Sequence, residues 1–152
     1  MTTFSELVKS KAIEPTFLRK QASVADIERQ IQAINSLDTE DPNSRSFSRI
    51  EASANGSLEE LKGAIRDLDI LLYKANPDIK ADEDYKADQI VIREIQFKLY
   101  EVIDSYTDLM KDKGVQYPPD KPQVPAPNPG DLADVLAQLV KSQNDSSALQ
   151  AN

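Results

Sequence analysis

Residues 82–113 decide the fold, and their sequence is DEDYKADQIVIREIQFKLYEVIDSYTDLMKDK. Apolar side chains recur in this stretch every seven residues, with a second series between them: Tyr85, Ile92, Leu99 and Tyr106, then Ile95, Val102 and Leu109. Such a repeat places one apolar stripe along a single α-helix. Acidic residues crowd the first turn, where the helix dipole favours negative charge, and Gly114 follows as the C′ residue. We therefore predict a helix that begins near Asp82 or Asp84 and ends at Lys113.

An earlier segment, Thr16–Leu37, carries the same heptad spacing. Thr16 is its expected N-cap, and Pro15 separates it from a short helix expected over Ser5–Lys11. The apolar positions of its stripe are Phe17, Val24, Ile27, Ile31 and Ile34. Lys20 is the one polar residue on that stripe, so the segment is predicted to be a helix with one apolar face.

A third segment, Asn43–Lys74, repeats Phe47, Ala54, Leu61 and Leu68 by seven. A turn precedes it, in which Pro42 is expected at a first helical position. Gly56 is expected to kink or break this helix, because glycine costs about 1 kcal/mol relative to alanine inside a helix.

The three segments have short connections and a shared period, which predicts an all-α fold. We expect an elongated antiparallel helical hairpin or three-helix bundle with a tethered C-terminal helix. The predicted parts are an N-terminal arm or short helix over residues 1–15, the helical bundle over residues 16–114, a proline-rich linker over residues 115–130, an amphipathic helix over residues 131–143 and a disordered tail over residues 144–152.

The C-terminal amphipathic helix is the predicted interaction element. Its apolar face consists of Leu132, Val135, Leu136, Leu139 and Val140. A helix of this length is not stable alone in water, so we expect it to dock on the bundle, on a second copy or on another protein. The linker before it fits the P-x-x-P pattern at residues 119–122 and 122–125, and a spacer role is favoured over recognition by a partner domain.

The composition limits the chemistry. The 152 residues include no cysteine, no histidine and no tryptophan, which removes disulfides, the usual general base and the commonest transition-metal ligand. The net charge of −8 opposes nucleic acid and anionic lipid as main partners. We expect no membrane span and no signal peptide, and therefore an intracellular, cytoplasmic protein.

Two groups of polar residues each have a functional interpretation and a simpler structural one. The acidic residues Asp82, Glu83, Asp84 and Asp88 resemble a metal site, but they lack calcium-loop spacing, and helix capping explains them better. Asp88 and Lys20 both occupy stripe positions, so they either pair across the bundle and fix its register or lie as ordinary polar residues near helix ends. We predict no catalytic residue, cofactor, metal or small-molecule substrate.

The order of the segments resembles a known family. Leu18-Arg19-Lys20-Gln21-Ala22-Ser23 opens a helix that ends at Leu37-Asp38, and residues 45–73, Glu83-Asp84-Tyr85 and a helix through YEVIDSY at 100–106 follow. This arrangement resembles the N-terminal helical region of Gag-like polyproteins of Bel/Pao-type retrotransposons from animals, over about residues 17–113. The chain lacks the Cys/His zinc knuckle and the aspartic-protease triplet of a full polyprotein. The resemblance implies a structural protein that self-associates.

These observations lead to two functional hypotheses. The first is a structural self-assembly protein that acts through helix–helix packing as a homo-oligomer, within an assembled particle. The second is an adaptor, scaffold or chaperone-like module that binds another polypeptide through the bundle or the C-terminal helix. Neither requires an enzyme activity.

Overall fold

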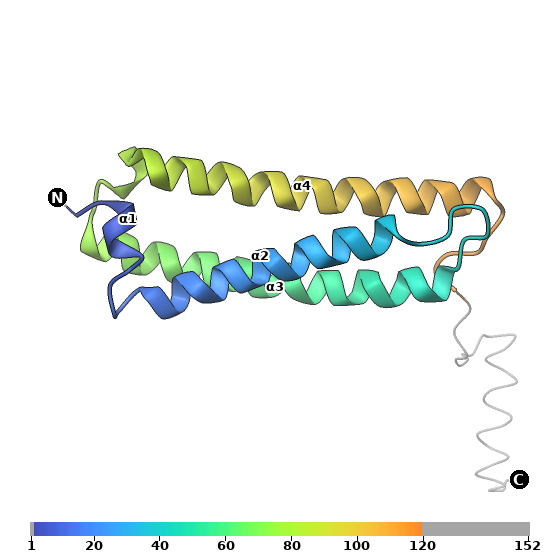
Figure 1. The fold of residues 1–152 in the computed structure, drawn as a ribbon, viewed down its shortest axis with the longest axis horizontal. Helices are drawn as coiled ribbons and strands as arrows, with labels where there is room; N and C mark the ends of the chain where they lie inside the picture. Colours follow the sequence, from blue (N-terminus) through green and yellow to red (C-terminus); the bar gives the residue numbers. More distant parts are fainter. Residues whose placement is uncertain (1, 120–152) are drawn as a thin grey trace, which may run out of the picture. The chain divides into compact units, whose positions relative to one another are not determined.

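The computed structural model describes residues 2–119, in which four α-helices and one short 3₁₀ helix follow one another. They are α1 (Phe4–Leu7), α2 (Glu14–Asn35), α3 (Ser44–Ala75), the 3₁₀ helix η1 (Ile79–Ala81) and α4 (Glu83–Asp112). The three long helices lie side by side, with α3 antiparallel to α2 and α4 (Figure 1). The predicted all-α fold is confirmed for the described residues, which contain no strand, and the three-helix arrangement is the one present.

The helix α2 is central to this arrangement. It packs along α3 and along α4, whereas α3 and α4 contact each other much less. The outer face of α4 is consequently turned away from both neighbours. This leaves a long helical surface whose side chains are not needed for the core.

Capping residues set the start of α3 and both ends of α4 close to the positions that the sequence predicts. The Oδ1 atom of Asn43 accepts hydrogen bonds from the backbone N–H groups of Arg45 and Ser46, at 2.9 and 3.1 Å, so Asn43 is the N-cap of α3. The expectation that Pro42 occupies a first helical position is wrong, because Pro42 precedes this cap and is buried there. Gly114, with φ of 74°, ends α4 in the left-handed conformation as predicted.

The start of α2 differs from its prediction. Thr16 is not the N-cap, since the helix already begins at Glu14 and Ile13 occupies the cap position without a side-chain hydrogen bond. Pro15 lies in the first turn, where its missing N–H group has no helical partner to lose. The proline therefore starts this helix instead of separating it from the preceding segment.

The helix α3 is continuous from Ser44 to Ala75, so Gly56 does not break it. The exposed position of Gly56 and the long buried stripe on the opposite side explain why the glycine is tolerated. The short N-terminal helix is also real, but it covers Phe4–Leu7 instead of Ser5–Lys11.

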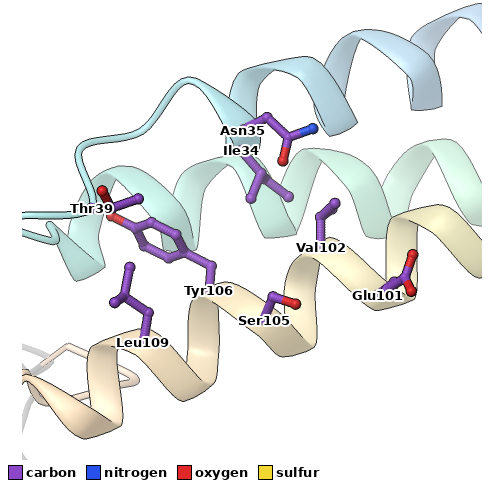
Figure 2. Close-up of a pocket in the computed structure, with 8 residues that line it drawn as sticks. All are labelled: Ile34, Asn35, Thr39, Glu101, Val102, Ser105, Tyr106 and Leu109. Atoms are coloured by element: carbon purple, nitrogen blue, oxygen red, sulfur yellow. The ribbon is translucent and has the colours of Figure 1, made fainter.

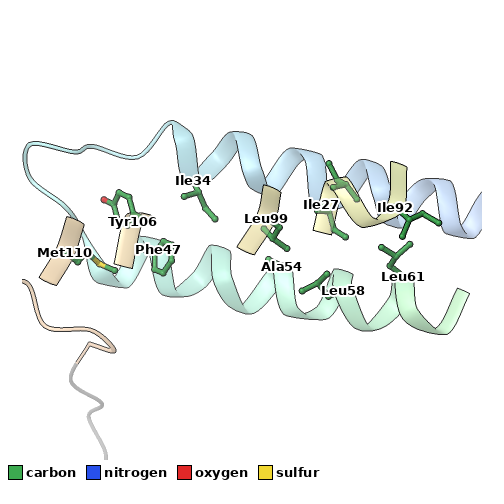
Figure 3. Packing of buried hydrophobic residues seen from close by; sticks show 11 residues of the cluster. Ile27, Ile34, Phe47, Ala54, Leu58, Leu61, Ile92, Leu99, Tyr106 and Met110 are labelled. Atoms are coloured by element: carbon green, nitrogen blue, oxygen red, sulfur yellow. The ribbon is translucent and has the colours of Figure 1, made fainter. Parts of the chain in front are cut away.

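The core divides into two neighbouring clusters. The larger one fills the space between the three long helices, as Figure 3 shows, and contains Ile27, Ile34, Phe47, Ala54, Leu58, Leu61, Ile92, Ile95, Leu99, Tyr106 and Met110. The smaller one lies where α1 and η1 cover the bundle end, and contains Phe4, Leu7, Val8, Ile13, Leu68, Leu72, Ile79 and Tyr85. The N-terminal residues are thus part of the hydrophobic core.

Candidate interaction surface

Lys20 and Asp88 form an ion pair inside the bundle. The Nζ atom of Lys20 lies 2.7 Å from Oδ1 of Asp88 and 2.7 Å from Oε1 of Gln21, and 4.7 Å from the centroid of the Phe17 ring. Lys20 is 1% exposed. Of the two alternatives for these residues, the pairing across the bundle is the one present, and it links α2 to α4. Its ammonium group is engaged on several sides, which suits a role in holding the two helices in register.

A second polar contact lies between α3 and α4. The Tyr85 hydroxyl donates a hydrogen bond to Oδ1 of Asp69 at 3.1 Å. Burial, together with the nearby charge of Asp69, raises the pKa of Tyr85 to about 12. Burial also raises the pKa of Asp69 above its ordinary value. At neutral pH the Tyr85 phenol is consequently protonated, and it acts as a hydrogen-bond donor within the fold.

The acidic residues at the start of α4 serve separate partners. Asp82 is the N-cap, and its second carboxylate oxygen accepts a hydrogen bond from the Phe4 backbone N–H at 3.0 Å, which lowers the pKa of Asp82. Asp84 accepts a hydrogen bond from the Ser5 hydroxyl at 2.8 Å. Within residues 2–119, no three His, Cys, Asp or Glu side chains gather as metal ligands would. The geometry here is that of capping and of attaching α1 to the bundle.

A hollow of about 340 Å³ lies between the end of α2 and the second half of α4 (Figure 2). Its lining combines apolar and polar groups: Ile34, Val102, Tyr106 and Leu109, then Asn35, Thr39, Glu101 and Ser105. The Tyr106 hydroxyl is already bound to the Asp38 carbonyl oxygen at 2.9 Å. The hollow is open to solvent, and the Ser105 hydroxyl and the Glu101 carboxylate lie one turn apart on α4, while the Thr39 hydroxyl comes from the segment after α2 (Figure 2).

The outer face of α4 carries large apolar side chains in contact with solvent. Ile90 is 49% exposed, Phe97 is 64% exposed and Tyr100 is 47% exposed. Side chains three, four or seven residues apart lie on one side of a helix, so these three share a face. Buried Leu99 lies on the opposite side of the same helix. An apolar patch of this kind commonly marks a site of protein–protein contact.

Charged residues extend this face beyond Ile90 and beyond Tyr100, and one lies between Ile90 and Phe97. Lys86 and Arg93 lie toward the N-terminus of α4, and Asp104 lies toward its C-terminus, all three exposed. We define the outer stripe of α4 as the six residues Lys86, Ile90, Arg93, Phe97, Tyr100 and Asp104. Their spacing alternates between four and three, which is a second heptad pattern on a helix whose first heptad faces the core.

The residues predicted to dock, Leu132, Val135, Leu136, Leu139 and Val140, lie outside the described residues, as do the linker beyond Pro119 and the tail. Their role stays a prediction. The sequence interpretation missed the outer stripe of α4, although Ile90 and Phe97 are spaced by seven, like the core residues Ile92 and Leu99. That second repeat was the available signal.

No family model, curated protein or solved structure matches the chain. None of the helices in the described part of the chain is both long and apolar enough to cross a membrane. A function can therefore be proposed only from the surface of the bundle.

Proposed function

We propose that the chain is a structural protein that self-assembles through helix–helix packing in the cytoplasm. The observation that carries this proposal is the row of Ile90, Phe97 and Tyr100 on the outer face of α4. Burying a side chain of this size is favourable by about 1.5–3 kcal/mol, and the bundle itself leaves all three about half exposed or more. The resemblance to Gag-like helical regions supports the same proposal.

The polar groups of the bundle also fit a structural role. Lys20 is paired with Asp88, and Tyr85 with Asp69, each joining two helices. These contacts hold side chains in place between the helices, which supports a structural role.

Sedimentation velocity of the full chain, from low micromolar to near-millimolar concentration, tests the proposal. We expect the weight-average mass to rise with concentration, because association follows mass action. A mass that stays at that of one chain of 16.9 kDa over the whole range would refute self-assembly.

The adaptor hypothesis has one observation in its favour. A second apolar patch lies on α3, where Ile70 is 60% exposed beside the half-buried Tyr73, with Arg66, Lys74 and the half-buried Asp69 around them. An acidic amphipathic helix of another protein would match this patch in polarity. A stoichiometric complex with a different polypeptide, abolished by Ile70→Asp and retained by Phe97→Asp, would favour this second function.

A further inference from the structure

We propose that two copies of this chain pack their α4 helices antiparallel along the outer stripe, with the two-fold axis midway between Arg93 and Phe97. This inference rests on the proposed self-assembly and specifies which surface makes the contact. The occupant of the exposed face is therefore a second copy. Three features support it: the composition of the stripe, its self-complementarity and the hollow beside it.

The six stripe residues are all exposed and follow one another at alternating intervals of four and three. In antiparallel packing of two such helices, each residue of the stripe meets one of the partner's stripe. A two-fold axis exchanges the copies, so every contact occurs twice. The test of the idea is whether residues at equal distances on either side of the axis suit each other.

The residues suit each other in all three layers of the interface, where a layer is one stripe residue and the partner residue that it meets. Next to the axis, the guanidinium of Arg93 meets the ring of the partner's Phe97, a cation–π pairing. One step further out, Ile90 meets the partner's Tyr100, which buries two apolar surfaces. In the outermost layer, Lys86 meets the partner's Asp104, a pair of opposite charge. Parallel packing would instead bring Lys86 against the partner's Lys86 and Asp104 against the partner's Asp104.

A hollow of about 360 Å³ strengthens this choice of register. It is lined by Lys80, Tyr85, Lys86, Gln89, Ile90 and Arg93, next to the basic half of the stripe. Lys80, Lys86 and Arg93 thus line a recess together with Tyr85 and Ile90 in a chain whose net charge is −8, and Lys86 also pairs with Glu83 at 3.3 Å. The antiparallel arrangement brings the partner's Tyr100 and Asp104 to this hollow, so a ring and a carboxylate meet a recess of matching polarity.

Charge reversal tests the outermost layer. Lys86→Asp and Asp104→Lys, each alone, place like charges together twice per dimer, so we expect each to weaken dimerisation about tenfold or more at low salt. The double variant restores opposite charges and should return the dissociation constant close to that of the wild type. Lys98→Asp is the matched control for Lys86→Asp, because Lys98 is an exposed residue of α4 off the stripe and the charge change is the same.

Cysteine cross-linking tests the register itself, and the chain has no native cysteine to interfere. Ile90→Cys and Tyr100→Cys proteins, mixed after one is given a mass tag, should form a disulfide between the two species. Either protein alone should not, because its two cysteines would lie about 15 Å apart along the helix axis. Parallel packing would reverse this result, joining each single variant to itself.

The outcomes separate the inference from the proposed function. Rescue by the double charge reversal together with the mixed disulfide supports the antiparallel α4 interface. A wild-type protein that associates, while the stripe variants associate equally well and do not cross-link, overturns this interface and leaves self-assembly intact. A wild-type protein that is monomeric at every concentration overturns both.

Discussion

The buried ion pair between Lys20 and Asp88 gives the sharpest prediction about stability. Lys20→Met keeps an unbranched side chain of similar length but removes the ammonium group. Oδ1 of Asp88 then loses its hydrogen bond of 2.7 Å, and Oδ2 has no hydrogen-bond partner among the described residues even in the wild type. The substitution therefore strands a carboxylate between α2 and α4.

The size of the effect follows from burial. Breaking a buried ion pair by removing one partner typically costs about 3–5 kcal/mol. The Asp88 side chain is 16% exposed, so water reaches part of it, and we expect the lower end of that range, about 3 kcal/mol. Asp88→Leu strands the Lys20 ammonium, which is 1% exposed, and should cost at least as much. The double variant Lys20→Met, Asp88→Leu has no unpaired charge and should lie within about 1 kcal/mol of the wild type.

Urea unfolding followed by far-UV circular dichroism measures these free energies, provided that the slope with urea is unchanged. The coupling free energy from the four proteins separates the pair from the packing of either side chain. Lys98→Met is the matched control on exposed helix surface, and it should change stability by less than about 0.5 kcal/mol. If Lys20→Met lowers the free energy of unfolding by less than about 1 kcal/mol, or if the double variant does not regain it, the assigned role of the ion pair is wrong.

Further predictions concern four single positions. Gly56→Ala should stabilise the protein by about 1 kcal/mol in urea unfolding, because a Cβ there meets nothing within 4 Å, whereas Gly114→Ala should destabilise it by a similar amount because φ is +74°. Leu99→Ala should lose about 3 kcal/mol of unfolding free energy, since Leu99 is fully buried, and an unchanged thermal midpoint would contradict the core assignment. The pKa of Tyr85 is raised to about 12, so the folded protein keeps the phenol proton to a higher pH than the unfolded chain does. The free energy of unfolding should therefore fall as pH rises from about 10 to about 12. Tyr85→Phe should remove that part of the fall, and an ultraviolet absorbance titration should lack the last phenol to ionise.

Much of the bundle could be predicted because its core follows one simple rule. Tyr85, Ile92, Leu99 and Tyr106 repeat by seven, and all four are buried. The same rule identified Lys20 and Asp88, since each interrupts an apolar stripe on a different helix. Two exceptions of opposite charge are paired when their helices align, and the sequence contained enough information to suggest it.

The start of α2 could not be predicted in this way. Helix ends depend on local hydrogen bonds, and Thr16 has the side chain that usually caps a helix. Ile13 is buried in the smaller core cluster, and this contact fixes the chain direction before Glu14. Tertiary packing thus starts the helix two residues before Thr16, with Pro15 in its first turn, where proline is well tolerated.

The outer stripe of α4 was not predicted from the sequence for a different reason. A second row of apolar residues on a helix indicates a second neighbour, but it does not say which one. The arrangement of α2 and α3 shows that neither covers Phe97, which leaves the row uncovered within residues 2–119.

The inner heptad of α4 packs the core of the bundle, and we propose that the outer heptad makes the contact between two copies. The inner one is completed by α2 and α3 within a single chain, and its polar exception, Asp88, is neutralised there by Lys20. The outer one keeps Ile90, Phe97 and Tyr100 about half exposed or more, and Lys86 at its basic end pairs with the exposed carboxylate of Glu83 at 3.3 Å. In the proposed dimer, a second α4 covers these apolar side chains and brings Asp104 to Lys86. A helix with a satisfied inner face and a self-complementary outer face can associate without unfolding. Substitutions at Phe97 should therefore change assembly while leaving the bundle stable. Substitutions at Leu99 should lower the free energy of unfolding of the bundle itself.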